Sequence, residues 1–309
     1  MKIVMMGSGG VGGFFGGRLA RTGVDVSFVA RGAHLAAMQT EGLVIENEPQ
    51  GDIHLPNVRA STDPAAFGSA DLVIISVKLW DTESAAQAIK PIVGPETAVL
   101  SLQNGVIKDE ILRREFPERS IMGGVAYVAT HISRPGVIHQ TGTMQRVIVG
   151  EYDGRPSERA QALHKALLRS GVTAELSGDV RRSIWEKFVF LVGLSATTAT
   201  TRKPLGAVRE NPRSRAFLLE IMREVVRVGR AHGVALPEDY ADQRLAFADT
   251  LPYDMTSSMA HDLERGNRLE VDWLSGGVVK LGREVGVRTP ANEEACVLLA
   301  VHAAGRAKP

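Results

Sequence analysis

The sequence predicts an α/β fold in which a doubly wound, mostly parallel sheet is followed by an all-helical region. Residues 1–31 read as a strand, a glycine-rich turn, a helix and a second strand. Apolar strand patterns then alternate with helical patterns as far as residue 178, which is typical of βαβ units. From Asp179 onward only helical patterns remain. A chain of 309 residues suits two domains, and we expect them to span 1–178 and 179–309.

The glycine-rich turn predicts a dinucleotide-binding site. Lys2–Met6 has the pattern of a short buried strand, and it leads into a G-x-G-x-x-G motif that opens a helix. Gly7 allows the tight turn, Gly9 lets the backbone approach a pyrophosphate, and Gly12 lets the helix pack close to the strand. The alternative is a glycine-rich turn that holds no ligand. The cofactor-binding candidates here are Gly7, Ser8, Gly9, Gly10, Val11 and Gly12.

The end of the second strand indicates which dinucleotide binds. An NAD site would carry an acidic residue about 20 residues beyond the glycines, to accept a hydrogen bond from the ribose 2′-hydroxyl. This chain has Ala30-Arg31-Gly32 at that place. Because a guanidinium attracts a 2′-phosphate, Arg31 favours NADP(H) as the cofactor. The alternative is that Arg31 is an ordinary solvated cation.

Composition and charge narrow the classes of partner. The 36 Lys and Arg residues nearly balance the 35 Asp and Glu residues, so the net charge of +1 gives no broad field for nucleic acid or an anionic membrane. We therefore expect a small-molecule partner. The one cysteine, Cys296, excludes an internal disulfide framework and is expected to be a buried, inert thiol. No stretch has the length and apolarity of a membrane span, and we expect a cytoplasmic protein.

Two later strands are predicted to deliver polar side chains to the ligand-binding edge of the sheet. The apolar run Asp71–Lys78 ends in a lysine, and the strand Thr97–Leu102 runs into Gln103-Asn104-Gly105. Ligands of doubly wound sheets bind at the carboxyl ends of the strands, so Lys78 and Asn104 should lie near the nicotinamide. The alternatives are a surface lysine and an Asn-Gly turn chosen for its backbone geometry.

The remaining strand patterns of the first half suggest antiparallel additions to the sheet. Leu43–Ile45 and Ile53–Leu55 indicate a short antiparallel excursion. After the strand Ser120–Tyr127, the segments Gly136–Gln140 and Arg146–Gly150 alternate as an antiparallel pair would. We expect that pair to extend the sheet at one edge.

The second half opens with a long apolar helix that contains a lysine. Asp179 is its expected N-cap, and Lys187 lies within the apolar run 184–192. Burying an ammonium without a partner is costly, so this lysine either reaches the surface or lines a polar cleft. If it lines a cleft, Leu191 and Ser195, one and two turns later, share that cleft.

Short motifs in both halves of the chain occur in an order that resembles a known family. A serine pair, Ser257-Ser258, stands where a helix would begin. The set consists of Gly7 to Gly12, the strand end at Lys78, Gln103-Asn104-Gly105, Trp185-Glu186-Lys187, Ser257-Ser258-Met259 with Asp262, and Leu269-Glu270-Val271-Asp272. In these motifs and their spacing the chain resembles the ketopantoate reductases (2-dehydropantoate 2-reductases) over nearly its whole length.

The resemblance implies a fold and an activity. The fold is a Rossmann domain followed by an all-helical domain of the 6-phosphogluconate-dehydrogenase-like kind, through which related enzymes often form homodimers. The activity is the NADPH-dependent reduction of ketopantoate to (R)-pantoate in pantothenate and coenzyme A biosynthesis. No metal is implied, and the eight histidines are dispersed without the spacing of a zinc site.

The resemblance also implies roles for single residues. Lys187 matches the catalytic lysine, Glu270 the substrate-orienting glutamate, Ser258 a substrate-binding serine, and Asn104 the asparagine beside nicotinamide and substrate. The chemistry agrees, because hydride addition to a ketone builds negative charge on oxygen that an ammonium can stabilise and then protonate. Glu270 could accept a hydrogen bond from a substrate hydroxyl and keep Lys187 protonated by pairing with it.

Three positions depart from the pattern of family members that reduce ketopantoate. Those members usually have asparagines where this chain has Leu191, Ser195 and Met255. The pocket would then offer fewer amide hydrogen bonds, and a substrate hydroxyl left without a partner costs about 1–3 kcal/mol. We therefore also hypothesise a different branched or aromatic 2-oxo acid as the substrate.

Two other readings remain open at this point. One is oxidation of a 2-hydroxy acid, against which Arg31 argues because NADP pools usually favour reduction. The other is a non-catalytic dinucleotide-binding sensor, against which the presence of Lys187, Glu270 and Ser258 argues.

Overall fold

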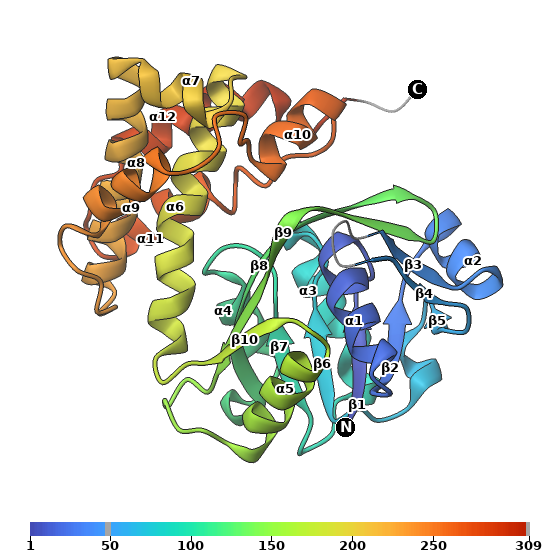
Figure 1. Ribbon diagram of the computed structural model, residues 1–309. Helices are drawn as coiled ribbons and strands as arrows, with labels where there is room; N and C mark the ends of the chain where they lie inside the picture. Colours follow the sequence, from blue (N-terminus) through green and yellow to red (C-terminus); the bar gives the residue numbers. More distant parts are fainter. Residues whose placement is uncertain (47–50, 307–309) are drawn as a thin grey trace. The chain divides into compact units, whose positions relative to one another are not determined.

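A computed structural model describes residues 1–46 and 51–306 of the chain. These residues form two compact units, the first comprising Met1–Asn104 and Lys108–Ser183, the second Gly105–Ile107 and Ile184–Pro309. The first unit holds a mostly parallel sheet with helices, and the second is helical (Figure 1). The predicted fold class is confirmed. A domain boundary between residues 178 and 179 stays a prediction.

The first unit is organised around one sheet. Its strands are β1 (Lys2–Met6), β2 (Asp25–Val29), β3 (Leu43–Glu46), β4 (Ile53–Leu55), β5 (Arg59–Ser61), β6 (Leu72–Ile75), β7 (Ala98–Ser101), β8 (Ile121–Arg134), β9 (Val137–Gly150) and β10 (Thr173–Leu176). They lie in the order β4-β3-β9-β8-β7-β6-β1-β2-β5, and β10 also pairs with β9. Since β1 pairs in parallel with both β2 and β6, the glycine turn follows an interior strand of the sheet.

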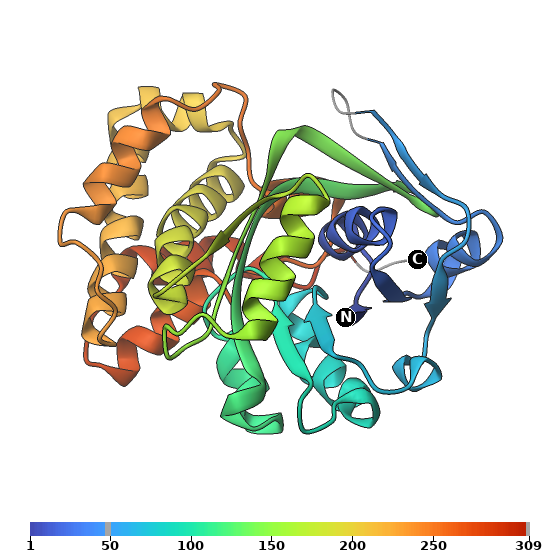
Figure 2. The same cartoon turned by 60° about the horizontal axis from the view of Figure 1, so that its bottom comes forward.

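Helices cover both faces of this sheet. They are α1 (Gly10–Arg21), α2 (Gly32–Thr40), α3 (Thr82–Ile89), α4 (Lys108–Glu115) and α5 (Glu158–Arg169), with short 3-10 turns at Pro64–Phe67, Leu79–Asp81, Lys90–Ile92 and Glu118–Ser120. Helices α1 and α5 lie on one face, and α3 and α4 on the other (Figure 2). The interior strands β6 and β7 are therefore buried on both sides, as the continuous apolar runs of the sequence predict.

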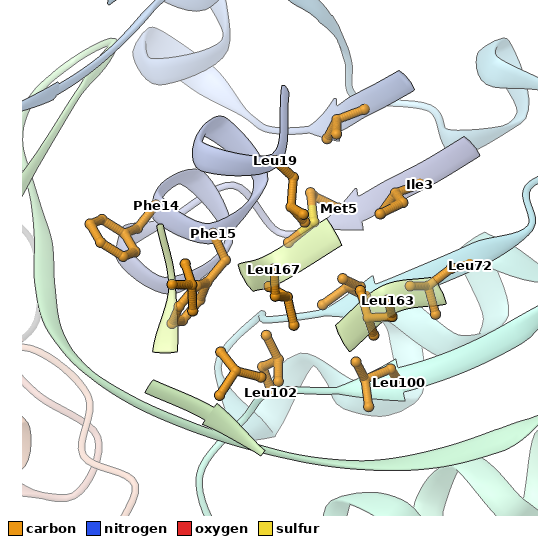
Figure 3. Close-up of a cluster of buried hydrophobic side chains, with 14 of the residues drawn as sticks. Ile3, Met5, Phe14, Phe15, Leu19, Leu72, Leu100, Leu102, Leu163 and Leu167 are labelled. Atoms are coloured by element: carbon orange, nitrogen blue, oxygen red, sulfur yellow. The ribbon is translucent and has the colours of Figure 1, made fainter. Parts of the chain in front are cut away.

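The alternation of side chains along β1 explains the two layers of core. Ile3 and Met5 point into a cluster that contains Phe14 and Leu19 of α1 and Leu163 of α5 (Figure 3). The intervening residues of β1 point to the opposite face, where α3 and α4 pack. Successive strand residues face opposite sides, so one five-residue strand contributes to both layers.

The prediction of an antiparallel pair within residues 136–150 is wrong. All of these residues after Gly136 belong to one continuous strand, β9, which pairs in antiparallel fashion with β8. The chain reverses earlier, at Gly136, whose φ is +77°. Gly142 also has a positive φ, of +70°, but there the strand continues past an irregularity in register instead of turning back. The antiparallel pairing of β3 with β4 is confirmed.

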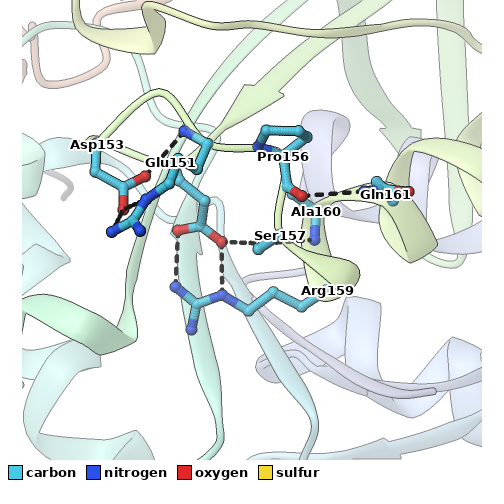
Figure 4. Close-up of polar contacts among 8 residues, drawn as sticks. Glu151, Asp153, Pro156, Ser157, Arg159, Ala160 and Gln161 are labelled. Atoms are coloured by element: carbon cyan, nitrogen blue, oxygen red, sulfur yellow. Dashed lines mark hydrogen bonds and ion pairs between the residues drawn. The ribbon is translucent and has the colours of Figure 1, made fainter.

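A buried carboxylate fixes the start of α5, the helix that connects β9 to β10. Glu151 accepts hydrogen bonds from Arg159 Nε at 2.7 Å and from its NH2 group at 2.8 Å (Figure 4). Glu151 also accepts from the hydroxyl of Ser157. That hydroxyl in turn accepts from Ala160 N at 3.2 Å, which makes Ser157 the N-cap. The crossover returns the chain so that β10 pairs in parallel with β9.

The second unit consists of helices. They are α6 (Val180–Thr201), which begins in the first unit, α7 (Leu205–Glu210), α8 (Pro212–Ala231), α9 (Tyr240–Asp249), α10 (Ser258–Arg265), α11 (Ser275–Glu284), α12 (Pro290–Leu299) and a 3-10 turn, Ala300–His302. The carboxylate of Asp179 accepts from Arg182 N at 3.0 Å and caps α6 as expected. The buried Glu224 of α8 accepts from Ala291 N at 2.8 Å and Asn292 N at 2.9 Å, so α8 caps α12. Across the described ranges, no helix has the length and apolarity to span a membrane.

Candidate functional site

The glycine turn has the geometry of a phosphate-binding site. Gly7 adopts a φ of +95°, which a residue with a side chain rarely adopts. A Cβ at Gly12 would lie 2.0 Å from the Gly7 carbonyl oxygen and 2.3 Å from Ser76 Oγ, so α1 can pack here only without a side chain. At Gly9, in contrast, a Cβ would meet nothing within 4 Å. The turn thus leaves open space at the one glycine that should face a ligand.

The first turn of α1 offers unpaired amides to that space. The first intrahelical bond runs from Gly13 N to Gly9 O, at 2.7 Å, so the amides of residues 10–12 precede the helical ladder. The N-cap residue, Gly9, has no side chain that could cap these amides, and the first turn of α1 contains no acidic residue. Helix-start amides of this kind bind anions, so the residues present fit the pyrophosphate of a dinucleotide.

The other candidates in the turn have structural contacts. Ser8 is buried, and its hydroxyl donates to Val29 O at the end of β2, at 3.0 Å. Gly10 lies under β8, since a Cβ there would come within 2.5 Å of the Thr130 carbonyl oxygen. Val11 is half-buried and packs against the core. The hydroxyl of Ser8 therefore holds the turn to β2, whereas its backbone stays part of the turn.

Arg31 lies where β2 leads into α2. It is exposed and takes the N-cap position of α2 with an extended backbone, φ −137° and ψ 160°. The next residue, Gly32, has a φ of +56°, and the first turn of α2 contains no acidic residue. An exposed guanidinium beside the positive end of a helix dipole suits a 2′-phosphate.

Lys78 and Asn104 follow neighbouring parallel strands. β6 pairs with β7, and Lys78 follows β6 while Asn104 follows β7. Both side chains are half-buried. The ammonium of Lys78 lies 5.8 Å from the centre of the Trp80 ring. Their roles toward a nicotinamide stay predictions.

Gln103 connects these two strand ends, a role that the sequence analysis missed. It is 7% exposed, and its amide nitrogen donates to Val77 O at 3.0 Å and to Thr82 Oγ1 at 2.8 Å. Its amide oxygen accepts from Ser101 Oγ at 2.9 Å. Gln103 thus fixes the loop after β6 to the loop after β7. The one available signal was a polar residue placed directly after a buried strand.

In the second unit, α6 carries three of the candidates on successive turns. Lys187 and Leu191 are half-buried, and Ser195 is 1% exposed. Residues four apart share one helix face, so these side chains follow one line along α6. Within residues 1–46 and 51–306, the Ser195 hydroxyl has no hydrogen-bond partner.

The line of candidates on α6 leads to the start of α10. Thr198, three residues after Ser195, shares a hydrogen bond with Ser257, and their Oγ1 and Oγ atoms lie 2.8 Å apart. Ser257 is the N-cap of α10, since its hydroxyl accepts from Ala260 N at 3.0 Å. Ser258, the predicted substrate-binding serine, is the first helical residue and is exposed. The two serines therefore differ in their surroundings: Ser257 caps the helix, whereas Ser258 is exposed to solvent.

The remaining candidates lie on the segments before and after α10. Met255 is half-buried, and its carbonyl oxygen accepts from Leu205 N at 2.7 Å, which attaches this segment to α7. Glu270 is 7% exposed and opens the turn that leads to α11, where its carbonyl oxygen accepts from Leu274 N at 3.0 Å. The pairing of Glu270 with Lys187 stays a prediction.

The last side chains to place are the candidate metal ligands and the one cysteine. In the parts of the chain that the structure describes, no group of three or more His, Cys, Asp or Glu side chains could hold a metal ion. Cys296 is half-buried, and burial, aided by Asp272 and Glu293, raises the pKa of its thiol to about 11. A thiol with this pKa is protonated at neutral pH and is a weak nucleophile.

Comparison with known proteins identifies the family. The family model for ketopantoate reductase PanE/ApbA matches residues 3–154, and the model for its C-terminal domain matches residues 179–303. A 2-dehydropantoate 2-reductase from Mesorhizobium japonicum is 32% identical, with 97% of each chain covered. An uncharacterized oxidoreductase, YkpB, from Bacillus subtilis is 30% identical over 95% of this chain and 96% of its own.

A solved structure supports the same assignment. The PanE/ApbA family ketopantoate reductase from Ralstonia eutropha JMP134 is 36% identical, covers 98% of both chains and superposes with a TM-score of 0.89. The similarity thus extends over both units of the fold. The chain belongs to the ketopantoate reductase family and is an NADP-dependent oxidoreductase.

Proposed function

We propose that this enzyme reduces ketopantoate to (R)-pantoate with NADPH, as a step of pantothenate and coenzyme A biosynthesis. The observation that carries the proposal is Lys187, a lysine on the otherwise largely buried helix α6 of a chain that belongs to this family. Ketopantoate reduction needs a proton donor at the ketone oxygen, and an ammonium held at the edge of an apolar helix suits that task.

The residues that would hold NADP(H) lie in the first unit. The open space at Gly9 and the uncapped start of α1 suit the pyrophosphate, and Arg31 suits the 2′-phosphate. Lys78 and Asn104 suit the nicotinamide end of the site. Gln103, next to Asn104, holds their two loops together through its hydrogen bond to Val77 O. When bound, the nicotinamide supplies the hydride.

Lys187 acts on the oxygen of the ketone. As the carbonyl carbon accepts a hydride, negative charge develops on oxygen, and the ammonium stabilises that charge and then transfers its proton. Glu270 orients the substrate by accepting a hydrogen bond from its hydroxyl group, and Ser258 donates a hydrogen bond to the carboxylate of the substrate. Both residues therefore bind groups that flank the ketone.

A second candidate substrate is a branched or aromatic 2-oxo acid other than ketopantoate. Leu191 and Met255 present half-buried apolar side chains, and Ser195 is too short to reach as far as an amide side chain would. A hydroxyl of ketopantoate that finds no hydrogen-bond partner weakens the binding of ketopantoate. A 2-oxo acid with an apolar side chain has no such hydroxyl and so loses no hydrogen bond.

A turnover panel tests the proposal. NADPH oxidation is followed at saturating coenzyme with ketopantoate, with an unhydroxylated branched 2-oxo acid and with an aromatic 2-oxo acid, and each reaction is repeated with NADH. We expect kcat/KM for ketopantoate to exceed the others by at least about tenfold. The reverse order establishes the second candidate in its place. Absence of turnover with every acid, together with intact NADPH binding, contradicts both.

The proposal includes a homodimer formed through the second unit. Three apolar side chains near the C-terminal end of α12 are strongly exposed: Val297 by 73%, Leu298 by 53% and Val301 by 85%. Val297 and Val301 are one helical turn apart, and such patches mark contact surfaces. The double variant Val297→Lys, Val301→Glu should convert the dimer to a monomer in sedimentation velocity, while Leu168→Glu, at a 49% exposed leucine of the first unit, should not. A monomeric wild-type protein contradicts this part of the proposal.

A further inference from the structure

His34 joins the glycine turn to two other elements. Its ring lies half-buried in the first turn of α2. Nε2 lies 2.9 Å from the carbonyl oxygen of Ser8, and Nδ1 accepts a hydrogen bond from Gly136 N at 3.0 Å. One side chain thus bonds to the glycine turn after β1 and to the turn between β8 and β9.

These contacts require one tautomer of a neutral ring. The Ser8 carbonyl can only accept, so Nε2 must carry the proton and donate it. The amide of Gly136 can only donate, so Nδ1 must be unprotonated. Burial lowers the pKa of His34, which agrees with a neutral ring at physiological pH.

His34 lies between two predicted phosphate sites, the pyrophosphate site at Gly9 and the 2′-phosphate site at Arg31. Ser8 directly precedes Gly9, where the turn leaves open space, and α2 begins directly after Arg31. The turn at Gly136 also packs on α2, because a Cβ there would lie 3.0 Å from Ala37 Cβ. The imidazole therefore links the start of α2 to the turn that precedes α1.

We propose that His34 is a positioning residue for NADP(H), which holds the 2′-phosphate site at the start of α2 at a fixed distance from the pyrophosphate site at the start of α1. This inference rests on the cofactor-binding roles proposed for Gly9 and Arg31. A ligand that bridges two prearranged anion sites loses less free energy to ordering the protein. NADH has no 2′-phosphate and gains little from the arrangement.

Two conservative variants separate the two hydrogen bonds. In His34→Asn the side-chain oxygen can take the place of Nδ1 and accept from Gly136, but the bond to Ser8 is lost. In His34→Gln the side-chain nitrogen can take the place of Nε2 and donate to Ser8. We expect His34→Asn to raise the Kd for NADPH by about tenfold, with kcat at saturating NADPH unchanged. We expect His34→Gln to stay within about twofold of the wild type.

NADH and Arg31 provide the controls. The Kd for NADH, measured by the same fluorescence titration, should change less than the Kd for NADPH in His34→Asn. In an Arg31→Ala background, His34→Asn should add little, because the contact that it positions is already missing. Melting temperatures establish that each variant is folded, and if His34→Asn does not fold, His34→Gln and His34→Ala are compared in the same cycle.

Three results would overturn the inference. They are an unchanged NADPH affinity in His34→Asn, an equal loss for NADPH and NADH, and a fall of kcat without a change in coenzyme affinity. Failure of the proposed function looks different, since a wild-type protein that binds NADPH but turns over no 2-oxo acid leaves these binding measurements intact.

Discussion

Lys187→Met is expected to lower kcat by a factor of about 10²–10⁴, the range that a general acid contributes. Methionine keeps an unbranched side chain of similar length in α6, so the half-buried position remains filled. What disappears is the ammonium that stabilises the developing oxyanion and protonates it. The NADPH-binding candidates lie in the first unit, so the Kd for NADPH should stay within about twofold.

The control for this variant is Lys280→Met, which removes an exposed ammonium from α11 of the same unit. It should leave kcat and KM unchanged. Steady-state rates of NADPH oxidation and a fluorescence titration of NADPH together distinguish the expected result from loss of folding. A Lys187→Met enzyme with more than half of the wild-type kcat would remove this lysine from the chemistry.

Gly9→Ala is expected to weaken NADPH binding strongly without destabilising the protein. Gly9 has a φ of −71° and a ψ of −160°, which alanine adopts without strain, and a Cβ there meets nothing within 4 Å. The free energy of unfolding should therefore change by less than about 0.5 kcal/mol. The methyl group would occupy the space intended for the pyrophosphate, so the Kd for NADPH should rise at least about 30-fold.

Gly12→Ala is the matched comparison, because this variant should also destabilise the folded protein. Its Cβ would lie 2.0 Å from the Gly7 carbonyl oxygen, so the backbone of the turn has to shift. We expect the free energy of unfolding to fall by about 1–3 kcal/mol, in addition to weaker NADPH binding. Urea denaturation of both variants gives the comparison. If Gly9→Ala binds NADPH as the wild type does, the pyrophosphate does not lie over this turn.

The elements that local pattern determines were predictable from the sequence. The strand Lys2–Met6 has the bounds that its apolar pattern indicates, because a glycine turn follows it directly. The strand β9 was not predictable in the same way. Thr141-Gly142-Thr143 reads as a turn, yet β9 continues past it, because β8 pairs with β9 on both sides of this irregularity, Val128 with Gln145 and Thr130 with Gln140.

The site residues also differ in whether local sequence or distant contacts indicate their role. The glycines, Arg31 and Lys187 could be selected as candidates from the sequence because their chemistry is unusual at their position in the pattern, and their roles stay predictions. Gln103 and His34 could not, because each acts through partners distant in sequence: Val77 is 26 residues from Gln103, and Gly136 is 102 residues from His34. Contacts of this range exist only once the sheet has assembled.

The pairing of β9 also bears on how the molecule avoids aggregation. On the edge opposite β8, residues 137–139 pair with β3 and residues 146–149 with β10, so within the described chain the ladder is interrupted between them. An unprotected strand edge is a template on which a second polypeptide can add. Here the side chain of Gln140 donates to Met144 O at 3.0 Å, and the φ of +70° at Gly142 bends the backbone between them. The gap is therefore short and kinked, and it offers an incoming strand no flat surface on which to grow.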